Sequence, residues 1–213
     1  MRTLIGCVVL LFSMLAAGAK LTEGFTLWTS EAARALEVQR NPRTLPSIYL
    51  IDASGKPFNL HEITEQGRKV VLLDFFFTRC QTVCNILGQR FQQLQTEIQA
   101  RGLRERVSLL SISFDQGHDT PQELAAYAMR MQADSSIWHI ATSASVLDRA
   151  TALEAFQVMV IPDPLLLFQH NAAIHVLDTK ARLARIVDYD DPRSPLDIAQ
   201  DLTLKTATSG IEQ

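Results

Sequence analysis

The sequence predicts a single α/β domain in which helices cover a central mixed sheet, with a β-hairpin at its N-terminal side. Two apolar runs, residues 70–77 and 107–114, contain few polar side chains and are long enough for a strand. Continuous runs of this kind are typical of strands buried on both faces. Between them, apolar residues recur at helical spacing, namely Leu87, Phe91, Leu94 and Ile98. A strand, a helix and a second strand in succession indicate a three-layer α/β arrangement.

The other elements follow from turn and capping signals. The turn sequence D-A-S-G-K, residues 52–56, separates short strands at 48–51 and 57–60 and so predicts the hairpin. Asp119-Thr120-Pro121 predicts the start of a helix that runs to about residue 131, because proline is favoured in a first turn. The remaining expected elements are helices at 30–39, 86–101, 145–156 and 194–205, and strands at 137–141, 165–168 and 172–177. Residues 169–171 are expected to form a polar tip between the last two strands.

The first 19 residues have the pattern of a secretory signal peptide. Arg2 is followed by an apolar run at 4–15 and by the small residues of a cleavage site, A-G-A at 17–19. An uncleaved membrane anchor through residues 4–19 is the alternative, although this run is shorter than the roughly 20 residues that a spanning helix needs. We therefore predict export to the periplasm, either free or anchored to the inner membrane. Residues 20–44 are expected to form an N-terminal arm, residues 45–206 the domain and residues 207–213 a tail.

Composition and cysteine count limit the classes of function that the chain can have. The 213 residues are 47% hydrophobic and 20% charged, with a net charge of −3, which is ordinary for a globular domain. No basic run suggests a nucleic-acid partner. Of three cysteines, Cys7 lies in the signal segment, so cleavage leaves one pair, Cys80 and Cys84, in an oxidising compartment.

Cys80 and Cys84 lie where the buried strand at 70–77 gives way to a helix. Free backbone N–H groups and the helix dipole favour a thiolate at this junction. If the helix begins near Cys80, the spacing of four residues also turns both sulfurs to one side. A cysteine pair in this place makes the α/β domain specifically thioredoxin-like. Such a pair can hold a soft metal ion, act as a redox pair or form a structural disulfide, and zinc is disfavoured because no second ligand pair follows.

Four segments together resemble the Sco/SenC family of copper chaperones for cytochrome oxidase. Residues 78–84 read T-x-C-x-x-x-C, and residues 113–121 read S-F-D-x-x-x-D-T-P. Residues 156–158 read F-Q-V, similar to the F-G-V of the family, and residues 170–178 read H-N-A-A-I-H-V-L-D. The order and spacing of these segments match the family over roughly residues 45–190.

The resemblance implies a copper site formed by Cys80, Cys84 and His170. It also implies a role in delivering copper, or reducing equivalents, to the copper-bearing subunit of cytochrome c oxidase or to another copper protein. Thiolates and imidazole suit Cu(I), which is a soft ion. The chain departs from the family pattern at three positions, since Gln81 and Asn85 replace prolines after the cysteines and Gln169 replaces an aspartate before the histidine.

Several alternatives stay open at this point. His175 is the substitute ligand if His170 is not one, and Asp115 either contacts the site or only shapes a turn. Asp74, inside an apolar strand, is expected to be paired or to have a perturbed pKa. His61, His118 and His139 are expected to have no partners, and the methionines are expected to fill the core or surface.

Three alternative functions are also compatible with the cysteine pair. A thiol-disulfide reductase acting on a cuproprotein is the main one, and a cis peptide bond at Pro162 facing the cysteines would favour it. A peroxiredoxin-like peroxidase is disfavoured because the sequence lacks the proline of that family's motif. A redox or copper sensor is the third.

Overall fold

The computed structural model describes residues 2–21, 29–64, 68–80, 83–188 and 194–209. Within these residues, eight strands form one sheet, and two further strands form a separate hairpin. The strands of the sheet, from one edge to the other, are β1 (Arg43–Thr44), β10 (Arg182–Val187), β9 (Ile174–Leu177), β4 (Val70–Phe76), β5 (Val107–Ser113), β6 (Trp138–Ser143), β2 (Tyr49–Asp52) and β3 (Pro57–Asn59). The central strands β4, β5 and β6 are parallel and the outer pairs are antiparallel, which confirms the predicted mixed sheet.

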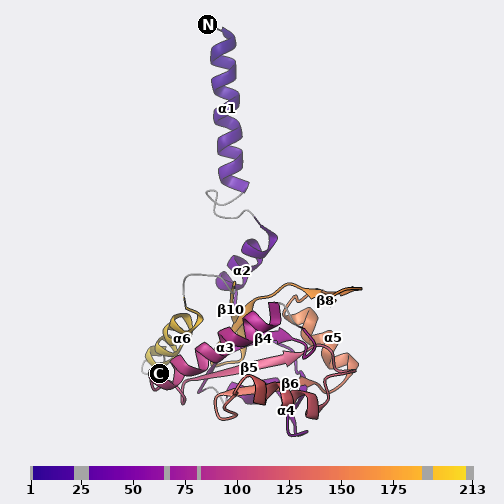
Figure 1. The fold of residues 1–213 in the computed structure, drawn as a ribbon. Helices are drawn as coiled ribbons and strands as arrows, with labels where there is room; N and C mark the ends of the chain where they lie inside the picture. The colour runs from indigo at the N-terminus through magenta and orange to yellow at the C-terminus, as the bar shows by residue number, and fades with distance from the viewer. Residues whose placement is uncertain (1, 22–28, 65–67, 81–82, 189–193, 210–213) are drawn as a thin grey trace.

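Helices pack on both faces of the sheet (Figure 1). The helices of the described residues are α1 (Arg2–Leu21), which does not pack on the sheet, α2 (Ser30–Arg40), α3 (Val83–Ala100), α4 (Pro121–Arg130), α5 (Val146–Ala155) and α6 (Pro195–Ser209), with a short 3-10 helix at Leu60–Thr64. Successive side chains of a strand point to opposite faces. Phe76 packs on Tyr127 of α4, whereas Phe75 packs on Phe156 at the end of α5, so these two helices lie on opposite faces.

The predicted core is confirmed in its central part. Every residue of β4 and β5 is buried, as expected for strands covered on both faces. The four apolar residues at helical spacing lie fully buried on α3, which ends before Gly102 with its positive φ of 64°. On the neighbouring helix, Thr120 caps α4 through its side chain and Pro121 follows in the first turn. Sequence periodicity therefore identified the elements that flank the cysteines.

The C-terminal third differs from the prediction. Residues 169–171 do not form a tip between two paired strands. Strand β8 (Leu167–His170) pairs instead with β7 (Val160–Asp163), and β9 pairs with β4 and with an unexpected strand, β10. His170 is thus the last residue of a small hairpin, opposite Val160. Pro162 and Pro164 are turn signals in the sequence, and they concealed the strand at 160–163.

The N-terminal region forms two helices. α1 stands clear of the sheet in Figure 1 and exposes large apolar side chains, including Leu11, Phe12 and Met14. Among the helices of the described residues, none has the length and apolarity needed to cross a membrane. α2 packs against the domain and buries Val38.

Candidate metal centre

The Cys80 segment begins at the carboxyl end of the central strand β4. Phe77 follows the strand and is buried, and the backbone N–H of Cys80 donates to the Phe77 carbonyl at 3.2 Å. Cys80 is half-buried against the hydrophobic core. α3 begins at Val83 rather than at Cys80, so the two cysteines do not share one helix in the way that the spacing argument assumed. Ligand sites of open α/β sheets gather at this edge.

Asp119 holds this segment in place. Its carboxylate is fully buried and accepts hydrogen bonds from the Thr78 backbone N–H at 2.9 Å and from Thr78 Oγ1 at 2.6 Å. Ser113 Oγ, from the end of β5, donates to the same carboxylate at 2.5 Å. A buried carboxylate needs such donors because water no longer solvates it. Asp119 therefore fixes the residues just before Cys80, a role that the sequence did not reveal because the residue looked like part of a helix start.

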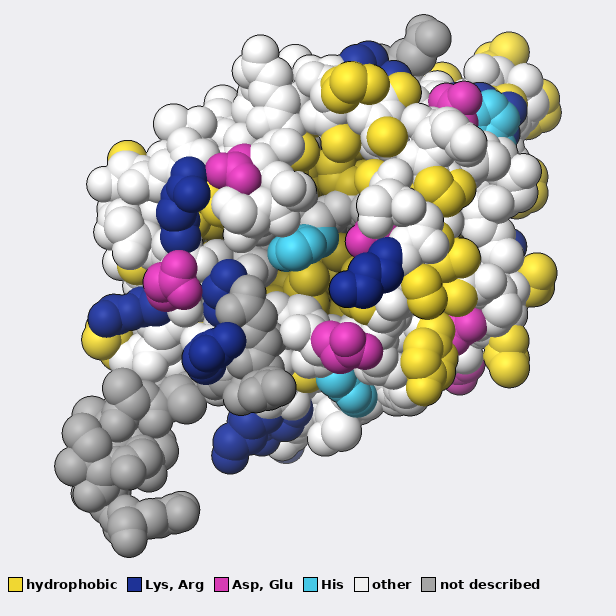
Figure 2. All heavy atoms as spheres, turned by 90° about the horizontal axis from the view of Figure 1, so that it is seen from below, with side chains coloured by type: hydrophobic (Ala, Val, Ile, Leu, Met, Phe, Trp, Pro, Cys, Tyr) yellow, Lys and Arg dark blue, Asp and Glu magenta, His cyan; other side chains and the backbone are white. Residues whose placement is uncertain are grey.

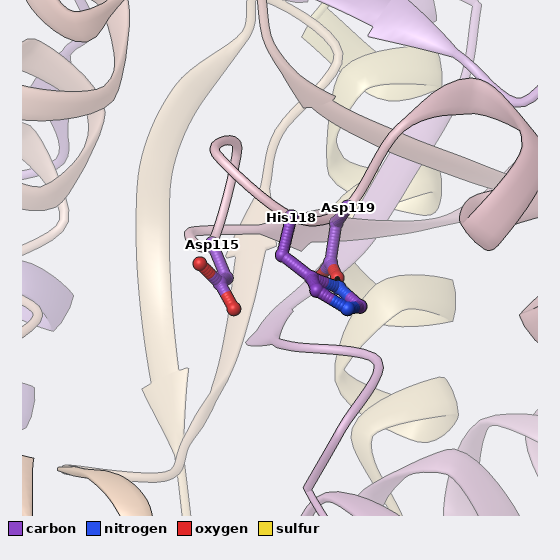
Figure 3. A group of neighbouring side chains, drawn as sticks. All are labelled: Asp115, His118 and Asp119. Atoms are coloured by element: carbon purple, nitrogen blue, oxygen red, sulfur yellow. Dashed lines mark hydrogen bonds and ion pairs between the residues drawn. The ribbon is translucent and has the colours of Figure 1, made fainter.

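Two neighbours of Asp119 complete this anchor (Figure 3). His118 Nδ1 lies 3.0 Å from Asp119 Oδ1, so the expectation that His118 has no partner was wrong. Asp115 Oδ2 lies 2.6 Å from Nη2 of Arg79, the residue before Cys80, and the Asp115 carbonyl accepts from two turn N–H groups. Asp115 therefore shapes the turn and pairs with the residue before Cys80, and its contact with a metal site stays a prediction.

Side-chain atoms of Asp115, His118 and Asp119 lie within 4.8 Å of one another. Donors of the protein itself already bind the carboxylates of this group. Arg79 pairs with Asp115, and Thr78 and Ser113 donate hydrogen bonds to Asp119. A guanidinium at 2.6 Å also opposes a cation electrostatically. We assign the group to anchoring the Cys80 segment.

His170 lies at the same edge of the sheet. Its ring packs edge-to-face on Phe114, which follows β5, at 5.1 Å between ring centroids. Phe114 in turn packs on Phe77 at 5.3 Å, and Phe168 of β8 packs on both. Burial lowers the pKa of His170 below its ordinary value. The imidazole is therefore neutral at neutral pH, which is the form that binds a metal ion.

Phe77, Phe114 and Phe168 form an aromatic cluster at this edge of the sheet. The His170 ring packs on Phe114, and Cys80 follows Phe77 by three residues, with its backbone N–H donating to the Phe77 carbonyl. The side chain of Cys84 lies outside the described part of the chain, so the three-ligand set remains a prediction. A thiol and a neutral imidazole at one edge are a donor set that suits a soft ion such as Cu(I).

His175 lies elsewhere, inside the sheet. It pairs with Leu73 in the middle of β4 and is 1% exposed, with its ring edge-on to Phe75 and Phe156. Burial, with the nearby positive charge of Arg34, lowers its pKa to about 3. This is the environment of a neutral core histidine, away from the strand end that carries Cys80.

The structure also tests the expectations for Asp74, Pro162 and the methionines. Asp74 is buried, and burial raises its pKa to about 7, as expected of a carboxyl group in an apolar strand. The peptide bond before Pro162 is trans, so the condition that would favour a reductase is not met. Met129 and Met159 are exposed surface residues.

The face seen in Figure 2 carries charged side chains of both signs, interspersed around a hollow with an apolar floor. A single-sign field of the kind that attracts nucleic acid is not seen on this face.

Comparisons with known proteins agree with this architecture. A model of the SCO1/SenC family matches residues 37–205. A protein from Stutzerimonas stutzeri, whose name proposes that it binds copper, is 33% identical over 85 residues, 40% of this chain and 40% of that protein. The match thus spans less than half the length of this curated relative.

Two solved structures share the fold. A SCO1/SenC family lipoprotein from Bacillus anthracis is 26% identical with a TM-score of 0.66, covering 78% of this chain and 97% of that one. ScoI from Bradyrhizobium japonicum, solved with copper bound, is 21% identical with a TM-score of 0.58, covering 76% and 99%. These likenesses confirm the predicted thioredoxin-like α/β class. Since the family model also covers well over half of the chain, this protein belongs to the SCO1/SenC family.

Proposed function

We propose that the protein is an extracytoplasmic copper metallochaperone. It would bind copper as cargo through Cys80, Cys84 and His170 and deliver it to the copper-bearing subunit of cytochrome c oxidase or to another copper protein. The observation that carries the proposal is the aromatic cluster of Phe77, Phe114 and Phe168 at the ends of β4 and β5. The neutral His170 ring packs on Phe114, and Cys80 follows Phe77 in the next turn of the chain.

The chemistry follows from the nature of the donors. Cu(I) prefers thiolate, with imidazole as a compatible third ligand. The thiols must lose their protons to bind, so affinity should rise with pH, whereas His170 is already neutral and adds no such cost near neutral pH. The third ligand comes from the β7–β8 hairpin, so movement of that hairpin offers a route for releasing the cargo.

Copper titration of the reduced protein against a competing chelator tests the proposal. We expect one Cu(I) per chain, and His170→Ala should weaken binding by at least the roughly 10- to 100-fold that loss of an outer contact to a metal ligand costs. His61→Ala, which removes an exposed histidine from a short 3-10 helix, is the matched control and should bind as the unaltered protein does. One-to-one binding that survives His170→Ala unchanged would remove the three-ligand site.

The same variants also test the alternative function, a thiol-disulfide reductase. Turnover on protein disulfides in the absence of copper, lost on Cys80→Ser but kept on His170→Ala, would favour the reductase over the chaperone.

A further inference from the structure

The β7–β8 hairpin, which ends at His170, is closed at its base by one asparagine. Asn171 Oδ1 accepts from the Met159 backbone N–H at 2.7 Å, and Asn171 Nδ2 donates to the Gln157 carbonyl at 3.2 Å. A single side chain therefore joins the residue that follows β8 to the residues that precede β7. The backbone next to His170 is held on both sides of the hairpin.

Helix α2 reaches the same place from the N-terminal region. Arg34 Nη1 donates to the carbonyl oxygens of Phe156 and Gln157 at 3.0 and 2.9 Å. Arg34 Nη2 lies 2.6 Å from Glu31 Oε2, and Glu31 Oε1 accepts from Asn171 Nδ2 at 3.5 Å. The Arg34 side chain is only 10% exposed, whereas that of Glu31 is 46% exposed, so the guanidinium is the buried member of this group. Charge-assisted hydrogen bonds of this kind are the stronger ones in proteins.

The backbone between α5 and β7 needs this support. Gln157 has a φ of 54°, in the left-handed region that non-glycine residues rarely adopt. Such a conformation persists where the surroundings hold it. Arg34 and Asn171 both bind the carbonyl oxygen of Gln157, so they hold the chain where it turns into the hairpin.

We propose that Glu31, Arg34 and Asn171 form a clamp that positions His170 for metal binding. The inference rests on the proposed function, because it assumes that His170 is a ligand. These three are positioning residues, since they act through the backbone on either side of the hairpin. Asn171 adjoins His170 directly, so rotation of the backbone at Asn171 would move the imidazole off Phe114. Helix α2 is then part of the scaffold of the site rather than a passive arm.

A double-mutant cycle on the full chain tests the clamp, with Cu(I) alone as the probe. The four proteins are the unaltered chain, Asn171→Ala, His170→Ala and the double variant. We expect Asn171→Ala to weaken Cu(I) binding roughly 10-fold or more, as for other contacts that orient a ligand. In the His170→Ala background the same change should cost nothing further, because the clamp acts only through that ligand. A general structural defect would instead lower affinity in both backgrounds.

Hydrogen exchange of the copper-free protein gives a second readout that does not depend on the metal. In Asn171→Ala, and in Glu31→Ala if the first variant folds poorly, amides of residues 159–170 should exchange faster while those of β4 and β5 do not change. Arg43→Ala is the control, because it breaks the exposed ion pair with Glu37 on the same N-terminal segment without touching the hairpin.

The outcomes separate the two claims. If His170→Ala weakens binding but Asn171→Ala leaves both affinity and exchange unchanged, the clamp is overturned and the copper site stands. If His170→Ala itself has no effect, the three-ligand site and the clamp fall together.

Discussion

Asp74 is a carboxyl group in the middle of the sheet, 1% exposed, with its pKa raised by burial to about 7. In the unfolded chain its pKa is near 3.8. At pH values well below 3.8 the group is protonated in both states. Between pH 4 and 7 the unfolded chain releases the proton while the folded chain keeps it, so the free energy of unfolding falls as pH rises.

Asp74→Asn should remove this pH dependence. Because one pKa unit corresponds to 1.36 kcal/mol, the variant should gain up to about 4 kcal/mol of stability over the native chain at pH 8 and little at pH 4. Urea unfolding at a series of pH values measures the difference. Asp134→Asn is the matched control, for which we expect a change in stability of the opposite sign. Hydrogen bonds donated by Ser136 lower the pKa of Asp134, so this variant should lose stability at neutral pH. A native-like pH profile for Asp74→Asn would show that the carboxyl group is ionised in the folded protein.

The sequence identified Asp74 as a perturbed group because a single charge interrupted an apolar run. It did not identify Asp119 or Asn171, because an aspartate before Thr-Pro and an asparagine near a strand look like ordinary capping and turn residues. Their roles depend on partners more than ten residues away, such as Thr78 for Asp119 and Gln157 for Asn171. Only the tertiary structure brings these partners together.

At the scale of elements, the loop from β5 to α4 supports the cysteine segment. Asp119→Asn places an amide where the carboxylate accepts from Thr78 and Ser113, and it should cost about 1.5–3 kcal/mol of stability. It should also speed alkylation of Cys80 in the copper-free protein, measured by mass spectrometry. Asp52→Asn, which disrupts a comparable set of hydrogen bonds in the β2–β3 turn, should lower the melting temperature without changing the alkylation rate. Equal rates in both variants would argue against the anchoring role.

The elements themselves divide into two groups. Strands β4 and β5 and helices α3, α4 and α5 were predictable, because their apolar periodicity and caps agree with their burial. Strand β7 was not predicted, and the strand expected at 165–168 overlaps β8 only at residues 167 and 168. Apolar residues of both strands are exposed in a hairpin outside the main sheet, such as Ile161 at 58% and Leu167 at 41%. Pairing between distant strands, such as β9 with β4, leaves no local signal in the sequence.

At the scale of the molecule, the family was predicted by the order and spacing of several motifs rather than by any single motif. The cysteine pair alone allowed a disulfide, a metal site or a redox pair, and it was the joint order and spacing of the four segments, residues 78–84, 113–121, 156–158 and 170–178, that indicated the family. The fold explains why this spacing matters, because parallel β4 and β5 end at one edge and the β7–β8 hairpin brings a histidine to it.

The central claim is that two sulfurs and one imidazole hold the copper cargo. X-ray absorption at the copper edge of the reduced, Cu(I)-loaded full chain tests it most directly. The account predicts two sulfur neighbours and one imidazole nitrogen, with the imidazole signal absent from His170→Ala. A spectrum of the unaltered protein that shows only sulfur neighbours, or one that His170→Ala leaves unchanged, would contradict it.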